Sequence, residues 1–516
     1  MMPLVRFLGR LLGNLGIALF GALVAAVLVY VLWARAQPPL QLWHQVALEQ
    51  EFTAAKAEEI ATLDAYRALE DRVFAELDAE VYAQVPTGPA QRLNRFSPGS
   101  ASDPRRREPN WNRTFELIPE RPRGGVLLLH GMSDGPYSLR ALGQALHAQG
   151  YRVLGLRMPG HGTAPAGLLD VTWEDMAAAT QLGARHLADS LDGKPIHIIG
   201  YSTGAALALD YSLDAMGDSG AASGADSGAD SGADSGAAAE LPVPASLVLV
   251  SPAIGITPAA TLTRWFALMS HLPGLEQLAW TTLVPEFDPF NYNAFSANAS
   301  LQVHRMTRAT TRRVRRLAAE GPIEDFPATL VLLSVVDATV SPRAAVDNLL
   351  GHLASGRHEL LLYDINREAV TSPLIVTDTA ALTKQLMADA SLPFAITMVG
   401  NESAADRRVI ARYKAPGTAE VVRSDNLSGT WPDDTISLSH VDLPFPPDDP
   451  LYGRYPPQEP GQVFLGQLAI RGERGVLKIP AQWLLRLRHN PFYDYQERRV
   501  LDWIDQANAP TGNADD

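Results

Sequence analysis

The sequence predicts an α/β protein, with a mostly parallel sheet covered by helices on both faces. Short, continuously apolar runs such as GGVLLLHG and PIHIIG recur between residues 124 and 365, and helix-forming stretches separate them. Buried parallel strands have this continuous apolar composition, because helices cover both faces of the sheet. The 516 residues are 46% hydrophobic and 19% charged, which is typical of a globular protein.

The first element is an apolar run without charge at residues 15–33, long enough to cross a bilayer as a helix. Two arginines precede it and one follows, so the positive-inside rule places the N-terminus in the cytoplasm. We predict that residues 1–36 anchor the chain in a bacterial-type inner membrane, with the remainder in the periplasm. A cleaved signal peptide with a secreted product is one alternative, because ARA at residues 34–36 resembles a cleavage site. A buried core helix is the other.

Residues 37–94 are predicted as a helical spacer and the start of a linker. Helix formers and mixed charge fill the stretch from about 42 to 85, which predicts one long amphipathic helix. It is interpreted as a spacer or a strap across the domain, with a coiled-coil dimeriser as the alternative. The linker continues in RFSPGSASDPRRREPNWN, which is rich in Pro, Ser and Arg.

The main domain is predicted over residues 95–508, with 509–516 as a flexible tail. Its strands are expected in the apolar runs at 124–131, 151–162, 195–204, 245–255, 328–337 and 358–365. Helices are expected at 137–149 and from about 173 onward. Thr172 is the predicted N-cap of the second helix, with Asp175 placed for a capping box.

Two segments interrupt this alternation. Residues 218–240 repeat GADS units and are predicted to be a disordered surface loop, because they cannot bury enough apolar area. Residues 255–326 form an aromatic-rich helical insertion, interpreted as a lid or as extra core. Within it, HRMTRATTRRVRRLAAE is either a solvated helix face or a surface that docks onto anionic lipid head groups.

Composition excludes several function classes. The formal net charge of −14 argues against a nucleic-acid partner, which would need a basic surface. The chain has no cysteine, which excludes disulfides, thiolate metal sites and a cysteine nucleophile. Its His, Asp and Glu residues lack the spacing of a metal site, and no phosphate-binding glycine loop is present. We therefore expect no metal and no other cofactor.

The pentapeptide GYSTG places Ser202 between an apolar run and a small-residue helical pattern. A serine hydroxyl becomes a nucleophile when a base accepts its proton and nearby donors stabilise the oxyanion. Gly200 and Gly204 leave room for the sharp strand-to-helix turn of a nucleophile elbow. The alternative is a serine in a purely structural turn.

The oxyanion hole is expected from two backbone N–H groups. One belongs to Thr203, directly after the serine, and the other to Met132, in the loop that follows the first core strand. His130 in the same loop is interpreted as a structural residue and not as the base, because it precedes the serine in the chain.

Together, LLLHGMSDGPYSLR, RMPGHGTAP and GYSTG resemble the α/β-hydrolase fold. More narrowly, they are similar to the monoacylglycerol lipase, lysophospholipase and carboxylesterase branch of that family. The resemblance covers about residues 124–337 and leaves out the residues before Arg95. It implies a serine hydrolase whose catalytic residues follow in the order serine, acid and histidine.

The acid is predicted to be Asp337, in LLSVVDATVSP at the end of a strand, where a carboxylate can reach an imidazole. The D-x-T-V run also matches the pattern of the resembling family. Asp347 on a helix and Asp364 at the end of another strand are the alternatives.

The histidine is predicted to be His440, on a loop after an apolar run. His352 falls within a helix, His358 opens a strand at the wrong end, and His489 is expected to pack in the core. The family pattern places its histidine soon after the last strand. Here 103 residues (440 minus 337) separate the expected base from Asp337, which departs from that pattern.

These residues predict a membrane-tethered serine ester hydrolase that uses Ser202, His440 and Asp337 through an acyl-enzyme. The resemblance, the apolar insertion and the anchor favour lipid-like acyl esters, of monoacylglycerol or lysophospholipid type. The alternative is a non-catalytic, membrane-tethered binding or scaffold protein of the same fold.

Overall fold

The computed structural model describes residues 2–36, 38–217, 240–255, 266, 268–337, 340–368, 379–403, 406–433, 435–457, 461–466 and 486–508. Its strands are β1 Phe115–Leu117, β2 Gly125–Leu129, β3 Arg152–Leu156, β4 Ile196–Tyr201, β5 Ser246–Val250, β6 Trp280–Thr282, β7 Phe295–Ser296, β8 Ala328–Ser334, β9 His358–Tyr363, β10 Ala395–Asn401, β11 Arg408–Lys414 and β12 Val421–Thr430. Its α-helices are α1 Met2–Ala36, α2 Leu63–Leu77, α3 Arg140–Ala148, α4 Trp173–Asp189, α5 Thr203–Ala215, α7 Ala297–Leu317, α8 Pro342–Asn348, α9 Thr379–Ala388 and α10 Tyr493–Asn508.

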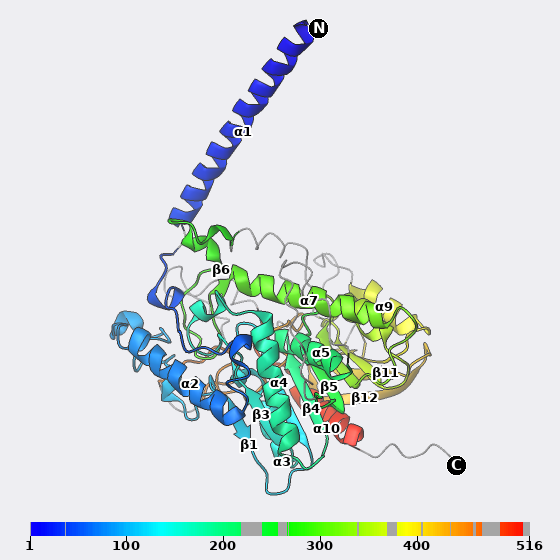
Figure 1. Cartoon of the computed structure of the whole chain (residues 1–516). Helices are drawn as coiled ribbons and strands as arrows, with labels where there is room; N and C mark the ends of the chain where they lie inside the picture. Colours follow the sequence, from blue (N-terminus) through cyan, green and yellow to red (C-terminus); the bar gives the residue numbers. More distant parts are fainter. Residues whose placement is uncertain are drawn as a thin grey trace, which may run out of the picture.

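A ten-stranded sheet forms the centre of the domain (Figure 1). Its strand order is β1-β3-β2-β4-β5-β8-β9-β10-β11-β12. All neighbours from β3 to β10 are parallel, whereas β1, β11 and β12 pair antiparallel at the edges. The predicted mostly parallel α/β sheet is confirmed, and each of the six predicted apolar runs contains a strand.

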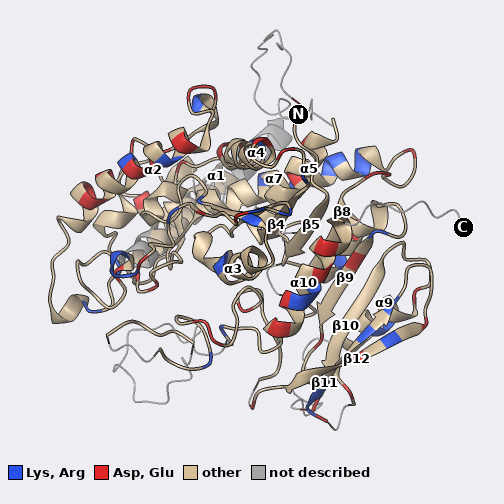
Figure 2. Cartoon of the chain, turned by 90° about the horizontal axis from the view of Figure 1, so that it is seen from below, with Lys and Arg blue, Asp and Glu red and all other residues tan. Residues whose placement is uncertain are grey.

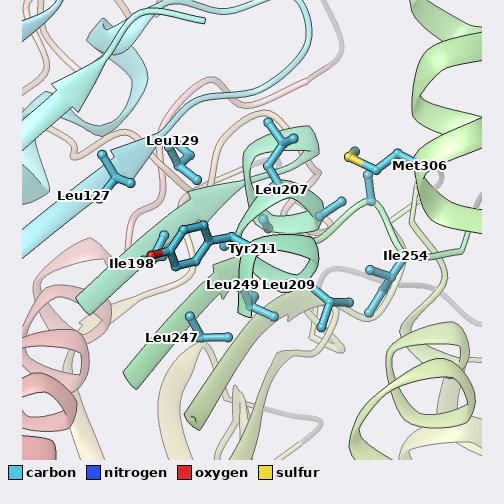
Figure 3. Packing of buried hydrophobic residues seen from close by; sticks show 14 of the residues in the cluster. Leu127, Leu129, Ile198, Leu207, Leu209, Tyr211, Leu247, Leu249, Ile254 and Met306 are labelled. Atoms are coloured by element: carbon cyan, nitrogen blue, oxygen red, sulfur yellow. The ribbon is translucent and has the colours of Figure 1, made fainter. Parts of the chain in front are cut away.

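Alternate residues of the central strands supply two separate cores. Leu127 and Leu129 of β2 point toward α5, where Figure 3 shows them in one cluster with Leu207 and Tyr211. Val126, between them in sequence, belongs to the core on the other side of the sheet. Because both faces are buried, the strand has to be apolar at every position, as the sequence predicted.

Helices cover both faces of the sheet. Helices α4 and α5 pack on one face, and α3 and α10 pack on the other (Figure 2). Helix α4 begins at the predicted capping box, in which Thr172 Oγ1 accepts from the Asp175 N–H and the Asp175 carboxylate accepts from the Thr172 N–H. Helix α7 of the insertion lies outside α5 and packs against it.

The segment before the domain is a strap of short helices, and the long helix expected over residues 42–85 does not form. Only α2 is a regular α-helix of several turns there, flanked by single-turn helices and a π-helical turn at Asp78–Tyr82. The strap is held by buried polar contacts. Glu51 pairs with the buried Arg157 guanidinium at 2.5 Å, and the Tyr66 hydroxyl donates to the Arg157 carbonyl at 2.7 Å. Such contacts to the domain break the helical pattern into pieces that follow its surface.

Helix α1 leaves the domain as a straight, isolated rod (Figure 1). Residues Gly13–Tyr30 have a mean hydropathy of 2.0, and none of this window is buried against the rest of the chain. The alternative of an ordinary core helix is therefore wrong. The length and composition fit a membrane span or a signal sequence. The GADS loop at 218–239 and the tail at 509–516 lie outside the described residues.

Candidate active site

Ser202 lies in the sharp turn between β4 and α5. Its backbone has φ +55° and ψ −113°, a conformation that costs energy for a residue with a side chain. Hydrogen bonds hold it there: the Ser202 N–H donates to the Val250 carbonyl at 2.9 Å, and the Ala253 N–H donates to the Ser202 carbonyl at 3.1 Å. The side chain does not cap α5, although serine at this position usually does. The hydroxyl is therefore not engaged by the N-terminus of α5.

Gly200 and Gly204 permit this turn because nothing larger fits. A Cβ on Gly204 would lie 2.0 Å from the Leu129 carbonyl oxygen, and one on Gly200 would lie 2.4 Å from the Ala205 nitrogen. These are contacts with backbone atoms, which cannot move aside without distorting β2 or α5. Both glycines thus set how closely α5 approaches the sheet behind Ser202.

The loop after β2 lies directly against Ser202. A Cβ on Gly131 would be 3.3 Å from the Ser202 Cβ. Met132 follows Gly131, and its carbonyl lies 2.7 Å from His161 Nε2. Thr203 opens α5, where backbone N–H groups have no partner within the helix. The two residues predicted for the oxyanion hole therefore lie on two segments that meet at the serine.

His130 holds this loop from behind. Its Nε2 accepts from the Met158 N–H at 3.0 Å, and its Nδ1 lies 2.9 Å from the Gly131 carbonyl. Complete burial lowers the pKa of His130 well below the ordinary value, with the neighbouring His161 adding to the effect. A neutral imidazole with both nitrogens engaged is a positioning residue, in line with the sequence interpretation.

Asp337 and His440 meet at the carboxyl end of the sheet. Asp337 follows β8, and its Oδ2 lies 3.0 Å from His440 Nδ1, with no exposed area on the Asp337 side chain. The Val340 N–H donates to the other carboxylate oxygen at 2.9 Å. This geometry leaves Nε2 as the nitrogen of His440 that faces away from the acid, as a general base requires.

The backbone of His440 is hydrogen-bonded to the side chain of the residue that precedes Ser202. The hydroxyl of Tyr201, the residue before Ser202, donates to the His440 carbonyl at 3.2 Å, and the two rings lie 5.3 Å apart. Two residues upstream, the Leu438 carbonyl accepts from the Ser334 hydroxyl at 2.9 Å. The loop that carries His440 is therefore tied to β4 and β8, the strands that precede Ser202 and Asp337.

The other acids and histidines considered from the sequence have different surroundings, and Asp347 is exposed on the surface. Asp364 forms an ion pair with Arg367 at 2.7 Å, and His352 lies 3.0 Å from the Asp347 carbonyl on the surface. His358 pairs with the first half of β8, at the end of the strand away from Asp337. His489 is buried and lies 3.3 Å from the Tyr452 carbonyl.

One polar residue at this site was missed by the sequence reasoning. Asp134 is half-buried in the loop after β2, and its carboxylate accepts from the Asn291 side chain of the insertion. Burial raises the pKa of Asp134 to about 6, against the lowering effects of Asn291 and of the nearby His440. Its position two residues after Met132 could have indicated a place near the site. Its contact with Asn291 could not be predicted, because Asn291 lies 157 residues away in the chain.

Part of the chain is similar to known proteins. Residues 126–368 match the model of the alpha/beta hydrolase family. This part of the chain has the α/β-hydrolase fold. The matched part contains the Ser202 elbow and Asp337 but ends before His440. The added strands β10–β12 lie between that end and the histidine loop, which explains the departure from the family spacing.

Similarity to individual proteins of this family is partial. A thermostable monoacylglycerol lipase from Bacillus sp. (strain H-257) is 35% identical over 85 residues, covering 16% of this chain and 33% of the lipase. This chain thus matches one third of that relative. Among solved structures, Paleococcus ferrophilus monoacylglycerol lipase is 16% identical, with a TM-score of 0.34 over 49% of this chain and 88% of that one. A monoglyceride lipase from Saccharomyces cerevisiae is 14% identical, with a TM-score of 0.35 over 49% and 82%.

Proposed function

We propose that this chain is a membrane-tethered serine ester hydrolase that uses Ser202, His440 and Asp337 as its triad. The observation that carries the proposal is the hydrogen bond between His440 Nδ1 and Asp337 Oδ2, formed by a loop that is tied to Tyr201 beside the serine. An imidazole braced by a buried carboxylate is the group needed to accept a serine proton.

The proposed reaction has two stages. Ser202 Oγ attacks the ester carbonyl while His440 Nε2 takes its proton, and Asp337 stabilises the imidazolium. The N–H groups of Thr203 and Met132 hold the oxyanion. The bond to the alcohol then breaks, and His440 protonates the departing oxygen. In the second stage His440 takes a proton from water as the water attacks the acyl-enzyme. The bond to Ser202 Oγ then breaks, His440 returns the proton to that oxygen, and the acid is released.

The proposed substrates are lipid-like acyl esters of monoacylglycerol or lysophospholipid type. The matching Bacillus relative is a monoacylglycerol lipase, and α1 would keep the domain beside a bilayer. Hydrolysis of p-nitrophenyl esters of increasing acyl length tests this proposal. We expect turnover that rises with chain length and vanishes in Ser202→Ala. A folded wild-type chain that hydrolyses none of these esters would support the non-catalytic scaffold instead.

The proposed location is the inner membrane, with the hydrolase domain in the periplasm. If α1 is an uncleaved anchor, the chain will sediment with membranes and resist alkaline carbonate extraction. Protease added to spheroplasts will then digest the domain. A soluble product that begins near residue 37 would show instead that residues 1–36 are a cleaved signal peptide.

A further inference from the structure

The side of the domain from which α1 emerges carries two unusual surfaces next to each other. One is an apolar segment that precedes β6 and lies beside the domain end of α1, and the other belongs to α7, which runs across this side (Figure 1). Together they form what we term the docking face. Its residues are Phe266, Leu268, Met269, Leu272, Arg305, Arg308, Arg312, Arg315 and Arg316.

The apolar part of the docking face is exposed although its side chains are large. Leu268 is 62% exposed and Leu272 is 55% exposed, with Phe266 and Met269 each above 40%. Clusters of exposed apolar side chains are typical of surfaces that bind a membrane or another protein. The domain end of α1 lies close by, beside the green segment that precedes β6 (Figure 1). If α1 spans a bilayer, this segment stands at the level of the bilayer surface.

The basic part of the docking face is formed by α7, which has one buried face and one exposed face. Its inner face is buried against α5, and there Arg313 forms ion pairs with Asp210 at 2.7 Å and Asp214 at 2.6 Å. The five other arginines of the helix lie on the opposite, exposed face. No acidic residue occurs within α7, so pairs inside the helix do not neutralise this face. Its positive charge contrasts with the net charge of −14 of the whole chain.

We propose that the docking face binds the surface of a bilayer that contains anionic phospholipids. The apolar segment would insert among the head groups, and the arginines of α7 would lie against lipid phosphates. This inference rests on the proposed anchoring by α1, since a tether brings the face to the bilayer at high effective concentration. It goes beyond that proposal because a tether alone does not specify which surface of the domain contacts the bilayer.

The docking face is connected to the candidate site through two helices that pack together, α7 and α5. Helix α7 contacts α5, and α5 begins directly after Ser202. The Arg313 ion pairs with Asp210 and Asp214 fix one helix on the other. A docked α7 would therefore hold the nucleophile elbow in one orientation relative to the bilayer that holds the ester substrate.

The experiment uses the full chain in lipid nanodiscs. Because the chain has no cysteine, L268C provides one labelling position for a polarity-sensitive fluorophore. V422C, on the exposed edge strand β12, is the matched control. We expect the label at 268 to shift to the blue and to be protected from an aqueous quencher in discs of phosphatidylcholine with phosphatidylglycerol. The label at 422 should behave as in water.

A charge variant tests the basic part. Arg305→Gln, Arg308→Gln and Arg312→Gln in one chain should abolish the difference between anionic and purely phosphatidylcholine discs. The charge-matched control replaces Arg72, Arg121 and Arg498 by Gln, three exposed arginines outside the docking face, and should retain it. A label at 268 that stays quenchable in both kinds of disc would overturn the proposal.

The outcomes separate this proposal from the ones on which it rests. If α1 is not an anchor, the chain will fail to co-elute with discs of phosphatidylcholine alone. If the chain is not a hydrolase, ester turnover will be absent while the label can still report docking. A chain that co-elutes and hydrolyses esters but shows a water-exposed label at 268 contradicts docking alone.

Discussion

His440 and Asp337 are 103 residues apart in the chain, and their side chains are joined by a 3.0 Å hydrogen bond. Between them the chain completes β9, adds β10 to the parallel sheet and adds β11 and β12 antiparallel. It then returns across the carboxyl ends of the strands, where Ser334 and Tyr201 hold the returning loop. The extra strands thus lengthen the connection without moving the imidazole away from the acid.

Replacing the proposed base should remove activity and leave the fold intact. We expect His440→Ala to lower kcat on the order of 10⁴-fold or more, because no other group in the proposed mechanism takes the serine proton. His352→Ala is the matched control, because His352 also follows Asp337 in the chain but its side chain lies against the Asp347 carbonyl. This variant should retain normal turnover. Steady-state kinetics with circular dichroism measures both. Normal activity in His440→Ala would assign the role to another histidine.

The turn behind Ser202 should not accept a single added methyl group. Gly204→Ala places a Cβ 2.0 Å from the Leu129 carbonyl, so we expect a loss of about 3 kcal/mol or more in the free energy of unfolding. Gly429→Ala on the exposed strand β12 is the control, since its Cβ would meet atoms no closer than 3.8 Å. Denaturant unfolding compares the two. Equal midpoints would refute the close approach of α5 to β2.

Glu116 should make stability depend on acid pH. Burial alone would raise its pKa, but hydrogen bonds from His186 and Arg152 outweigh burial and lower the pKa to about 2. A lowered folded-state pKa contributes stability above the unfolded value of about 4.3, which is lost as the pH falls toward 2. Glu116→Gln should therefore cost about 2 kcal/mol at pH 7 and progressively less below pH 4. Exposed Glu120→Gln should show no such dependence.

Removing Arg313 should destabilise the contact between α7 and α5. Arg313→Met leaves two carboxylates at this contact without their cation, at an expected cost of about 3–5 kcal/mol. Burial and the neighbouring Asp214 raise the pKa of Asp210 to about 7 even with Arg313 present. The variant should therefore be less destabilised at pH 6 than at pH 8, because a protonated Asp210 needs no partner. Its exposed neighbour Arg312→Gln should stay within about 0.5 kcal/mol of the parent.

Asp134 should affect turnover only where it is ionised. With a pKa of about 6, its carboxylate is neutral below that pH and, above it, attracts the positive charge that His440 gains during the proposed reaction. Asp134→Asn should match the wild-type kcat at pH 5 and fall below it at pH 8. A pH profile of kcat measured separately from KM checks this. Parallel profiles would limit Asp134 to holding Asn291 in place.

The elements that depend on a local sequence pattern could be predicted from the sequence. Continuous apolar runs identify β2, β4 and β8 because both faces of the sheet are buried. Thr172 and Asp175 identify the start of α4 because a capping box lies within four residues. The serine elbow could be located for the same reason, since GYSTG joins one strand to one helix.

Contacts between residues far apart in the chain could not be predicted from the sequence. The stretch from 42 to 85 looks helical throughout, yet packing against Arg157 and Asp175 divides it. Arg313 is one arginine among six in its segment, and only the tertiary structure makes it the buried one. Likewise, the sequence offered four histidines after Asp337, and only the folded arrangement of β10–β12 brings His440 to the acid.

The most direct test of Ser202 as the nucleophile is to find where a fluorophosphonate attaches. We expect one adduct, on the peptide that contains Ser202, absent in Ser202→Ala and strongly slowed in His440→Ala. Mass spectrometry of the digested, labelled chain measures it. An unlabelled but folded chain, or an adduct on a different serine, would contradict the assignment of Ser202 as the nucleophile.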